Sequence, residues 1–191
     1  EEAVSLRKHG RNKMILILGY VHESLFSVVV EQGISMDVYS LETCKKLSLV
    51  AERIGKAAKV HFKLDTGMSR LGVLANEESL DLLEEIRKLP YIEIEGIFTH
   101  FSAADEKDKT SSRQQLFLYQ EFIRRAKERG ITVPYYHCAN SAGIIDMRET
   151  DFNMVRAGIA LYGFYPSDEV ETEQVRLKPV LSLISHVVMV K

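Results

Sequence analysis

A cluster of charged residues follows one strand-like run and could bind an anionic ligand. The run is 59–62, and the stretch KLDTGMSRLG directly after it spans residues 63–72. This stretch places Lys63, Asp65 and Arg70 close together among glycines, a composition typical of a loop. Charges at the end of a buried strand indicate either a solvated turn or one edge of a ligand site.

Polar residues also collect where other apolar runs end. His100 lies near the end of the run 94–101, Asn140 and Ser141 follow the run 135–139, and Arg156 belongs to the run 154–157. Each alone has an ordinary structural explanation, such as a core histidine, a helix cap or an ion-paired arginine. In βα barrels, however, all strands end at one face, which carries the active site. The joint placement of these residues therefore favours one shared site.

Two of these loops suit a phosphate group. They contain Asn140-Ser141-Ala142-Gly143 and Arg156-Ala157-Gly158-Ile159. Barrels often hold phosphate between the loops that follow the last two strands. A serine hydroxyl at a helix start and free N–H groups in a glycine turn are suitable donors for a phosphate dianion. The sequence therefore predicts a phosphorylated ligand or cofactor.

The segments that carry these residues alternate between strand-like and helix-like patterns. Strand-like apolar runs occupy 14–19, 36–39, 60–64, 94–101, 135–139 and 154–157, and helix-like segments occupy 22–32, 41–57, 76–88, 112–129 and 141–147. This alternation predicts an α/β fold with a parallel sheet. An open doubly wound sheet and a closed barrel both fit, but no GxGxxG motif supports a dinucleotide fold. We expect a (β/α)8 barrel of which this chain holds about six units.

The ends of the chain suggest a longer protein. Residue 1 already lies in a helix-like pattern, and residue 191 follows the apolar run 187–190. We divide the chain into a partial barrel domain over 1–165, a linker over 166–178, and the start of a β-rich C-terminal domain over 179–191. The stretch LKPVLSLISHVVMV (177–190), which begins at the end of the linker, is expected to form one or two strands.

Composition excludes several classes of function. The net charge is −2, so no basic surface for nucleic acid or for a membrane is indicated. No apolar run approaches the roughly 20 residues that span a bilayer. Cys44 and Cys138 are far apart and have no metal-ligand spacing. We expect a cytoplasmic protein without a metal.

At this point the sequence resembles the alanine racemases, which depend on pyridoxal 5′-phosphate (PLP). The matching stretches are KLDTGMSRLGV (63–73), GIFTHFSAADE (96–106), HCANSAG (137–143) and VRAGIALYG (155–163). The resemblance implies PLP in the barrel, alanine as substrate, D-alanine for peptidoglycan as product, and a homodimer with shared active sites. Serine or broad-specificity racemisation is the alternative, because a small pocket rejects an added hydroxyl poorly.

The resemblance also assigns roles to residues. Arg156 matches an arginine that donates to the pyridine nitrogen of PLP, and His100 matches a histidine that contacts this arginine. Arg70 matches an arginine near the substrate carboxylate, and Lys63 matches a lysine that is often carbamylated and then holds that arginine. The remaining matches form the phosphate cup of the family: Asn140, Ser141, Gly158 and Ile159. Ser69 departs from the glycine that is frequent in its motif, so the local turn is expected to differ.

Two groups that the resemblance requires are not among these residues. The family's Schiff-base lysine is expected upstream of Glu1, and its tyrosine base is expected in the C-terminal domain of the partner subunit. These two groups would remove and return the α-proton from opposite sides of the substrate. Tyr162 and Tyr165 do not replace the tyrosine, because they lie at the exit of the barrel. We therefore expect the 191-residue chain alone to be inactive.

Four other functions remain open at this point. A non-catalytic PLP-binding barrel is disfavoured by the residues after Leu177, and a related decarboxylase would carry an acidic residue in place of Arg156. A membrane-tethered racemase domain would show hydrophobic helices upstream. A phosphate-binding barrel without PLP would lack the upstream lysine.

Overall fold

The chain folds into alternating strands and helices in this computed structural model, which describes residues 1–190. The strands are β1 (Leu16–Ile17), β2 (Ser35–Val38), β3 (Ala58–Asp65), β4 (Val73–Leu74), β5 (Ile92–Phe98) and β6 (Tyr135–His137). The helices are α1 (Glu2–Lys8), α2 (Phe26–Glu31), α3 (Leu41–Ile54), α4 (Glu77–Arg87), α5 (Thr110–Glu128) and α6 (Ser141–Asp146). Short 3-10 helices are η1 (Glu23–Leu25), η2 (Arg148–Thr150) and η3 (Ile159–Tyr162).

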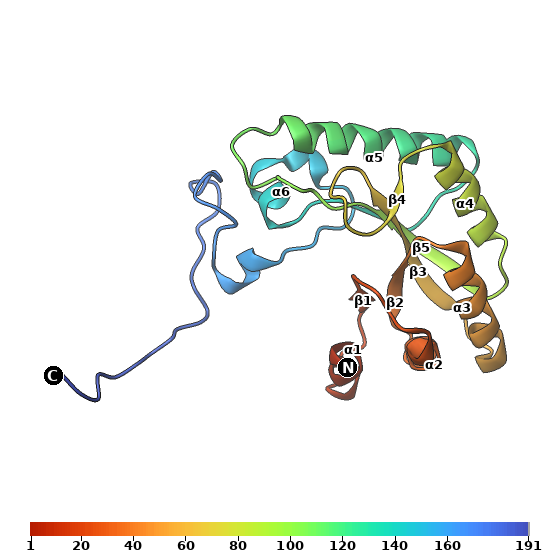
Figure 1. Ribbon diagram of the computed structural model, residues 1–191, viewed down its shortest axis with the longest axis horizontal. Coiled ribbons are helices and arrows are strands. Elements are labelled where there is room, and N and C mark those ends of the chain that lie inside the picture. Colours follow the sequence, from red (N-terminus) through yellow and green to blue (C-terminus); the bar gives the residue numbers. More distant parts are fainter. Residues whose placement is uncertain (191) are drawn as a thin grey trace.

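The strands form one parallel sheet in the order β1-β2-β3-β5-β6, with β4 paired to the end of β3. Helices α2 to α5 follow their strands around the outer side of this curved sheet (Figure 1). The arrangement is a half barrel, consistent with part of a (β/α)8 barrel, and the predicted α/β fold class is confirmed. Because every pairing is parallel, all strands end at the same edge.

Local signals determine where the helices begin and end. The side chain of Asn76 accepts a hydrogen bond from the Ser79 N–H at 3.0 Å and caps α4, as its sequence position predicts. Gly130 follows the C-cap of α5 with φ +71°, a left-handed conformation that glycine adopts without strain. Apolar residues recur on one face of α4, where Leu80, Leu83 and Ile86 are fully buried against the sheet.

Two predicted strands are wrong. Residues 154–157 contain no strand; the Arg156 N–H donates to the Ala139 carbonyl at 3.0 Å, and a single bond of this kind makes no ladder. Residues 179–190 also contain no helix or strand, and Lys191, the end of the same prediction, lies outside the described residues. A strand needs a neighbouring backbone to pair with, and this segment extends away from the sheet (Figure 1).

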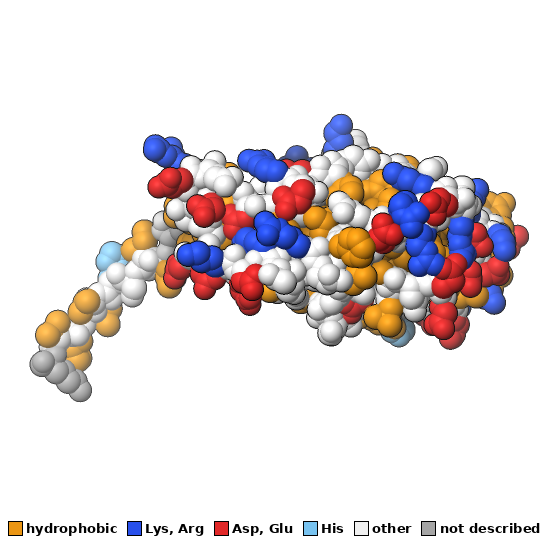
Figure 2. All heavy atoms as spheres, turned by 90° about the horizontal axis from the view of Figure 1, so that it is seen from above, with side chains coloured by type: hydrophobic (Ala, Val, Ile, Leu, Met, Phe, Trp, Pro, Cys, Tyr) orange, Lys and Arg blue, Asp and Glu red, His pale blue; other side chains and the backbone are white. Residues whose placement is uncertain are grey.

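The extended C-terminal segment exposes apolar side chains. Figure 2 shows it projecting from a body whose visible face mixes acidic and basic groups. Leu183 and Val188 are almost completely exposed in this segment. Among residues 1–190, no helix is both long and apolar enough to cross a membrane. The same residues include no group of three or more side chains of the kind that holds a metal ion.

Candidate active site

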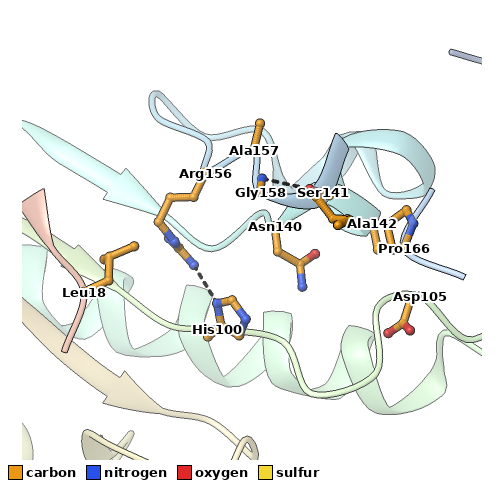
Figure 3. A pocket seen from close by; sticks show the side chains of 11 residues that line it. Leu18, His100, Asp105, Asn140, Ser141, Ala142, Arg156, Ala157, Gly158 and Pro166 are labelled. Atoms are coloured by element: carbon orange, nitrogen blue, oxygen red, sulfur yellow. Dashed lines mark hydrogen bonds between the residues drawn. The ribbon is translucent and has the colours of Figure 1, made fainter. Parts of the chain in front are cut away.

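A cavity of about 320 Å³ opens at the edge where the strands end. Its walls come from the loops after β5 and β6 and from the segment before η3 (Figure 3). The structure brings together six residues that the sequence analysis placed in the site: His100, Asn140, Ser141, Arg156, Gly158 and Ile159. Segments more than 50 residues apart in the chain therefore form one pocket, as the parallel topology requires.

Arg156 is the most highly connected of these residues. Its Nη2 donates to the Thr99 carbonyl at 2.8 Å and to the Cys138 carbonyl at 3.2 Å. The same nitrogen lies 3.3 Å from Nδ1 of His100, the contact drawn in Figure 3. Burial lowers the pKa of the Arg156 guanidinium to about 10, so it remains a cation at neutral pH. The site therefore holds a fixed positive group that only donates hydrogen bonds.

His100 is neutral in this environment. Burial is the main cause, and the charge of Arg156 adds to it, so the pKa of the imidazole falls to about 4. A neutral imidazole can accept the hydrogen bond from Arg156 through Nδ1. The predicted contact between His100 and Arg156 is thus present, and His100 acts here as an acceptor.

Sequence reasoning missed a second histidine beside Arg156. His137 is fully buried, and its Nδ1 is hydrogen-bonded to Nη1 of Arg156. His61, also fully buried, lies next to it, with 2.8 Å between His61 Nδ1 and His137 Nε2. The sequence contained a signal for His61 only. Residues two apart in a strand point to the same face, so His61 lies on the same face of β3 as Lys63.

The two loop segments near Ser141 are joined by hydrogen bonds at the wall of the cavity. Asn140 rather than Ser141 caps α6, because its side chain accepts the Gly143 N–H at 3.0 Å. The Ser141 hydroxyl accepts the N–H groups of Gly158 at 2.9 Å and Ala160 at 3.2 Å. This contact, drawn in part in Figure 3, joins the two loops that the sequence analysis paired. A hydroxyl and two backbone donors thus share one corner of the pocket.

Lys63 and Arg70 are not in hydrogen-bond contact within residues 1–190. Lys63 is 5% exposed, and its Nζ lies 4.5 Å from the centre of the Phe98 ring. Burial lowers the pKa of its amine to about 8, against the opposing attraction of Asp37. Arg70 is exposed on the following loop. The expected pairing of these two cations through a carbamate therefore stays a prediction.

Asp65 organises the loop that carries Arg70. Its carboxylate accepts the N–H groups of Gly67 and Ser69 at 3.0 Å and of Arg70 at 3.1 Å. Ser69 has φ +56°, a region in which a residue with a Cβ is strained. This explains why glycine suits the position and why the departure noted in the sequence matters. The loop keeps its shape through Asp65 in spite of Ser69.

Replacing Asp65 by asparagine is expected to destabilise the protein by roughly 1–3 kcal/mol. Both carboxylate oxygens accept backbone N–H groups, so the NH₂ of the asparagine amide would face one of these donors. Partial burial raises the pKa of Asp65, but the backbone donors outweigh it and hold the pKa below its ordinary value. The stabilisation is therefore present above the unfolded pKa, near 3.9, and is lost as the pH falls through the lower folded pKa.

Urea denaturation at several pH values measures it, with exposed Asp168→Asn as control. Equal stability of both variants at pH 7 would contradict the role of Asp65.

The chain is similar in sequence to known proteins. Residues 1–166 match the family model described as "Alanine racemase, N-terminal domain". An alanine racemase of Methanococcus maripaludis is 46% identical over 189 residues, which cover 97% of this chain and 51% of that protein. One from Clostridium tetani is 44% identical over 190 residues, covering 100% of this chain and 49% of the relative. The chain thus spans about half the length of the curated relatives it matches.

Solved structures agree with these matches. The alanine racemase of Clostridium difficile 630, in complex with cycloserine, superposes with a TM-score of 0.92 at 43% identity, covering 93% of this chain and 49% of that one. The alanine racemase of Bacillus anthracis with bound L-Ala-P gives a TM-score of 0.84 at 32% identity, covering 93% and 46%. The half barrel is therefore similar in fold to the corresponding part of both proteins.

Proposed function

The chain belongs to the alanine racemase family, and on this premise we propose that the complete protein interconverts L- and D-alanine with PLP as cofactor. The observation that carries the proposal is the partly buried, donor-only Arg156, which lines the same cavity as the Ser141 corner with its hydroxyl and N–H groups. The proposal includes a cytoplasmic homodimer that supplies D-alanine for peptidoglycan. It also includes the division into a barrel domain (1–165), a linker (166–178) and the start of a C-terminal domain (179–191).

The residues of the pocket fit PLP. Ser141 and the N–H groups of Gly158 and Ile159 would hold the phosphate, which would then take over the Gly158 N–H that the Ser141 hydroxyl accepts in this structure. Asn140 supports this corner by capping α6. Arg156 would donate to the pyridine nitrogen, because it has N–H groups to spare and no proton acceptor of its own. When bound, PLP supplies an electron sink for the α-carbon of an amino acid.

Arg156 determines which reaction that sink supports. An arginine donates a hydrogen bond and stays protonated, so it favours an unprotonated pyridine nitrogen. A carboxylate at this position would favour the protonated ring, which is the stronger sink. With PLP bound, this weaker sink would leave more of the charge near the α-carbon, which would favour return of a proton to that atom. This preference supports racemisation over transamination.

Some residues of the proposed site belong to this chain, and others belong to further segments of the complete protein. We propose that Lys63, whose amine is largely buried, is carbamylated and then holds Arg70 toward the substrate carboxylate. Its lowered pKa makes the neutral, reactive amine more abundant near neutral pH. The lysine and tyrosine that move the α-proton are expected in other segments of the complete protein.

Replacing Ser141 by alanine is expected to weaken PLP binding by roughly 10- to 100-fold, since one hydrogen bond to a charged group contributes about 1.5–3 kcal/mol. Absorbance titration of the complete protein with PLP measures this. Ser112→Ala is the matched control, because Ser112 is also buried but its hydroxyl has no partner within residues 1–190. Unchanged affinity of the Ser141 variant would place the phosphate elsewhere.

The function is tested by initial rates of the PLP-loaded complete protein with L-alanine and L-serine, measured side by side. A faster rate with alanine is expected. A serine rate equal or higher would indicate a serine or broad-specificity racemase. If neither amino acid were converted, a non-catalytic PLP-binding barrel would replace the proposal.

A further inference from the structure

A line of buried polar groups runs through the inner side of the sheet and ends at Arg156. After His137 and His61 it reaches Glu95, whose Oε2 lies 3.8 Å from His61 Nε2; this is an electrostatic contact, because His61 Nε2 has no hydrogen-bond partner among residues 1–190. Glu95 is 6% exposed and accepts from Ser35 at 2.5 Å and from Lys59 at 2.6 Å. Neither histidine lines the cavity, so neither is placed to touch a ligand there.

The sheet is built to accommodate this line. Between β3 and β5, Val60 is paired with Ile94 but His61 with Gly96, so Glu95 is the extra residue of a β-bulge. A Cβ at Gly96 would lie 2.3 Å from Nδ1 of His61. The bulge therefore turns Glu95 toward His61, and the glycine makes room for the imidazole.

The donor at each contact can be assigned in turn. Arginine only donates, so Nδ1 of His137 accepts from Arg156 and carries no proton. Burial holds the pKa of His137 far below its ordinary value, so the ring is neutral and its proton sits on Nε2. That N–H donates to Nδ1 of His61, which leaves the His61 proton on Nε2, facing Glu95.

The opposite tautomers would break the line at Arg156. If the His61 proton were on Nδ1, then His137 Nε2 would have to accept it and the His137 proton would move to Nδ1. Two donors, His137 Nδ1–H and the Arg156 guanidinium, would then face each other. The negative charge of Glu95, whose Oε2 lies 3.8 Å from His61 Nε2, favours the arrangement with the proton on that nitrogen.

Three Arg156 hydrogens are engaged in the observed arrangement. Nη1 donates to His137, and the two Nη2 hydrogens are shared among the Thr99 carbonyl, the Cys138 carbonyl and Nδ1 of His100, just after the ends of β5 and β6. The Nε–H and the second Nη1–H find no partner within residues 1–190, and these are the donors that remain for a cofactor. The orientation of the guanidinium therefore depends on His137 being an acceptor.

We propose that Glu95 and His61 are positioning residues for Arg156: Glu95 fixes the tautomer of His61, which fixes that of His137. The line then orients the guanidinium toward the pocket without touching cofactor or substrate. This inference rests on the proposed function, since it concerns the arginine assigned to the pyridine nitrogen. It adds to that function a set of residues on the far side of the arginine from the pocket.

The tautomers can be measured without cofactor or catalysis. In the PLP-free complete protein labelled with ¹⁵N-histidine, NMR should show His137 and His61 neutral, each with its proton on Nε2. A protonated Nδ1 on His137 would overturn the proposal, whether or not any variant folds. Racemisation by the wild-type protein is a separate measurement, so failure of the proposed function and failure of this inference are distinguishable.

A variant then tests the consequence for Arg156. An amide in Glu95→Gln can donate to His61 Nε2, so a second His137 tautomer should appear. We expect kcat for alanine to fall roughly tenfold or more through misorientation of Arg156, with PLP affinity within about twofold of wild type. Glu93→Gln, an exposed glutamate on the same strand, is the matched control and should change neither quantity. One unchanged tautomer and unchanged kcat in Glu95→Gln would refute the role of Glu95.

Discussion

Replacing Arg156 by glutamate is expected to lower alanine racemisation by roughly 10²–10³-fold, the effect typical of losing one preorganised donor at a reacting group. The change removes donors to two carbonyls and two histidines. It also places a carboxylate near the pyridine nitrogen, which would strengthen the electron sink. The fraction of turnovers that end in the keto acid should therefore rise. Chiral chromatography and a pyruvate assay on the PLP-loaded complete protein measure both quantities.

Arg113→Glu is the matched control, because Arg113 is exposed on α5, away from the pocket. It changes the net charge by the same amount and should leave both quantities near wild type. Arg156→Lys keeps the positive charge but loses the planar guanidinium, and its activity should lie between wild type and the glutamate variant. Wild-type racemisation by a folded Arg156→Glu protein would show that Arg156 does not serve the cofactor.

Replacing Gly96 by alanine is expected to destabilise the protein by about 2–3 kcal/mol, near the upper end of what overpacking of a core usually costs. The new methyl group would overlap the ring of His61, which is fully buried between neighbouring strands and cannot move into solvent. Thermal and urea unfolding of the complete protein measure the effect. Since the displaced ring is hydrogen-bonded to His137, the ¹⁵N signals of both histidines should shift as well.

Gly19→Ala is the control for this substitution. An added Cβ at Gly19 would meet no atom within 4 Å, and its φ is not in the left-handed region. The two variants add the same methyl group and remove the same backbone freedom from the unfolded chain. Equal stability of the two proteins would mean that the close approach of Gly96 to His61 is not a constraint.

The convergence of the pocket residues could be predicted because it depends on periodicity and topology. Alternating strands and helices require a parallel sheet, and a parallel sheet brings strand ends together. His100 and Asn140 lie just after the ends of β5 and β6, so their neighbourhood needed no knowledge of side-chain packing, whereas Arg156 joins them from a segment that forms no strand. The cap at Asn76 and the glycine at 130 were predictable for a related reason, since both signals act within one turn.

The line behind Arg156 could not be predicted because it depends on register. One extra residue at Glu95 shifts every later pairing between β3 and β5, and no local sequence signal marks that bulge. His61 and His137 are 76 residues apart and meet only once this register is set. The same limit explains the wrong strands at 154–157 and 179–190, whose apolar patterns describe segments that pair only where a neighbouring strand is available.

NMR in D₂O distinguishes α-proton exchange from transamination at this pocket. The PLP-loaded complete protein would be incubated with L-alanine, and deuterium at the α-carbon, D-alanine and pyruvate would be followed together. We expect α-deuterated alanine of both configurations, with pyruvate at trace level. Pyruvate formed as fast as D-alanine, or an α-proton that does not exchange, would contradict the proposed function.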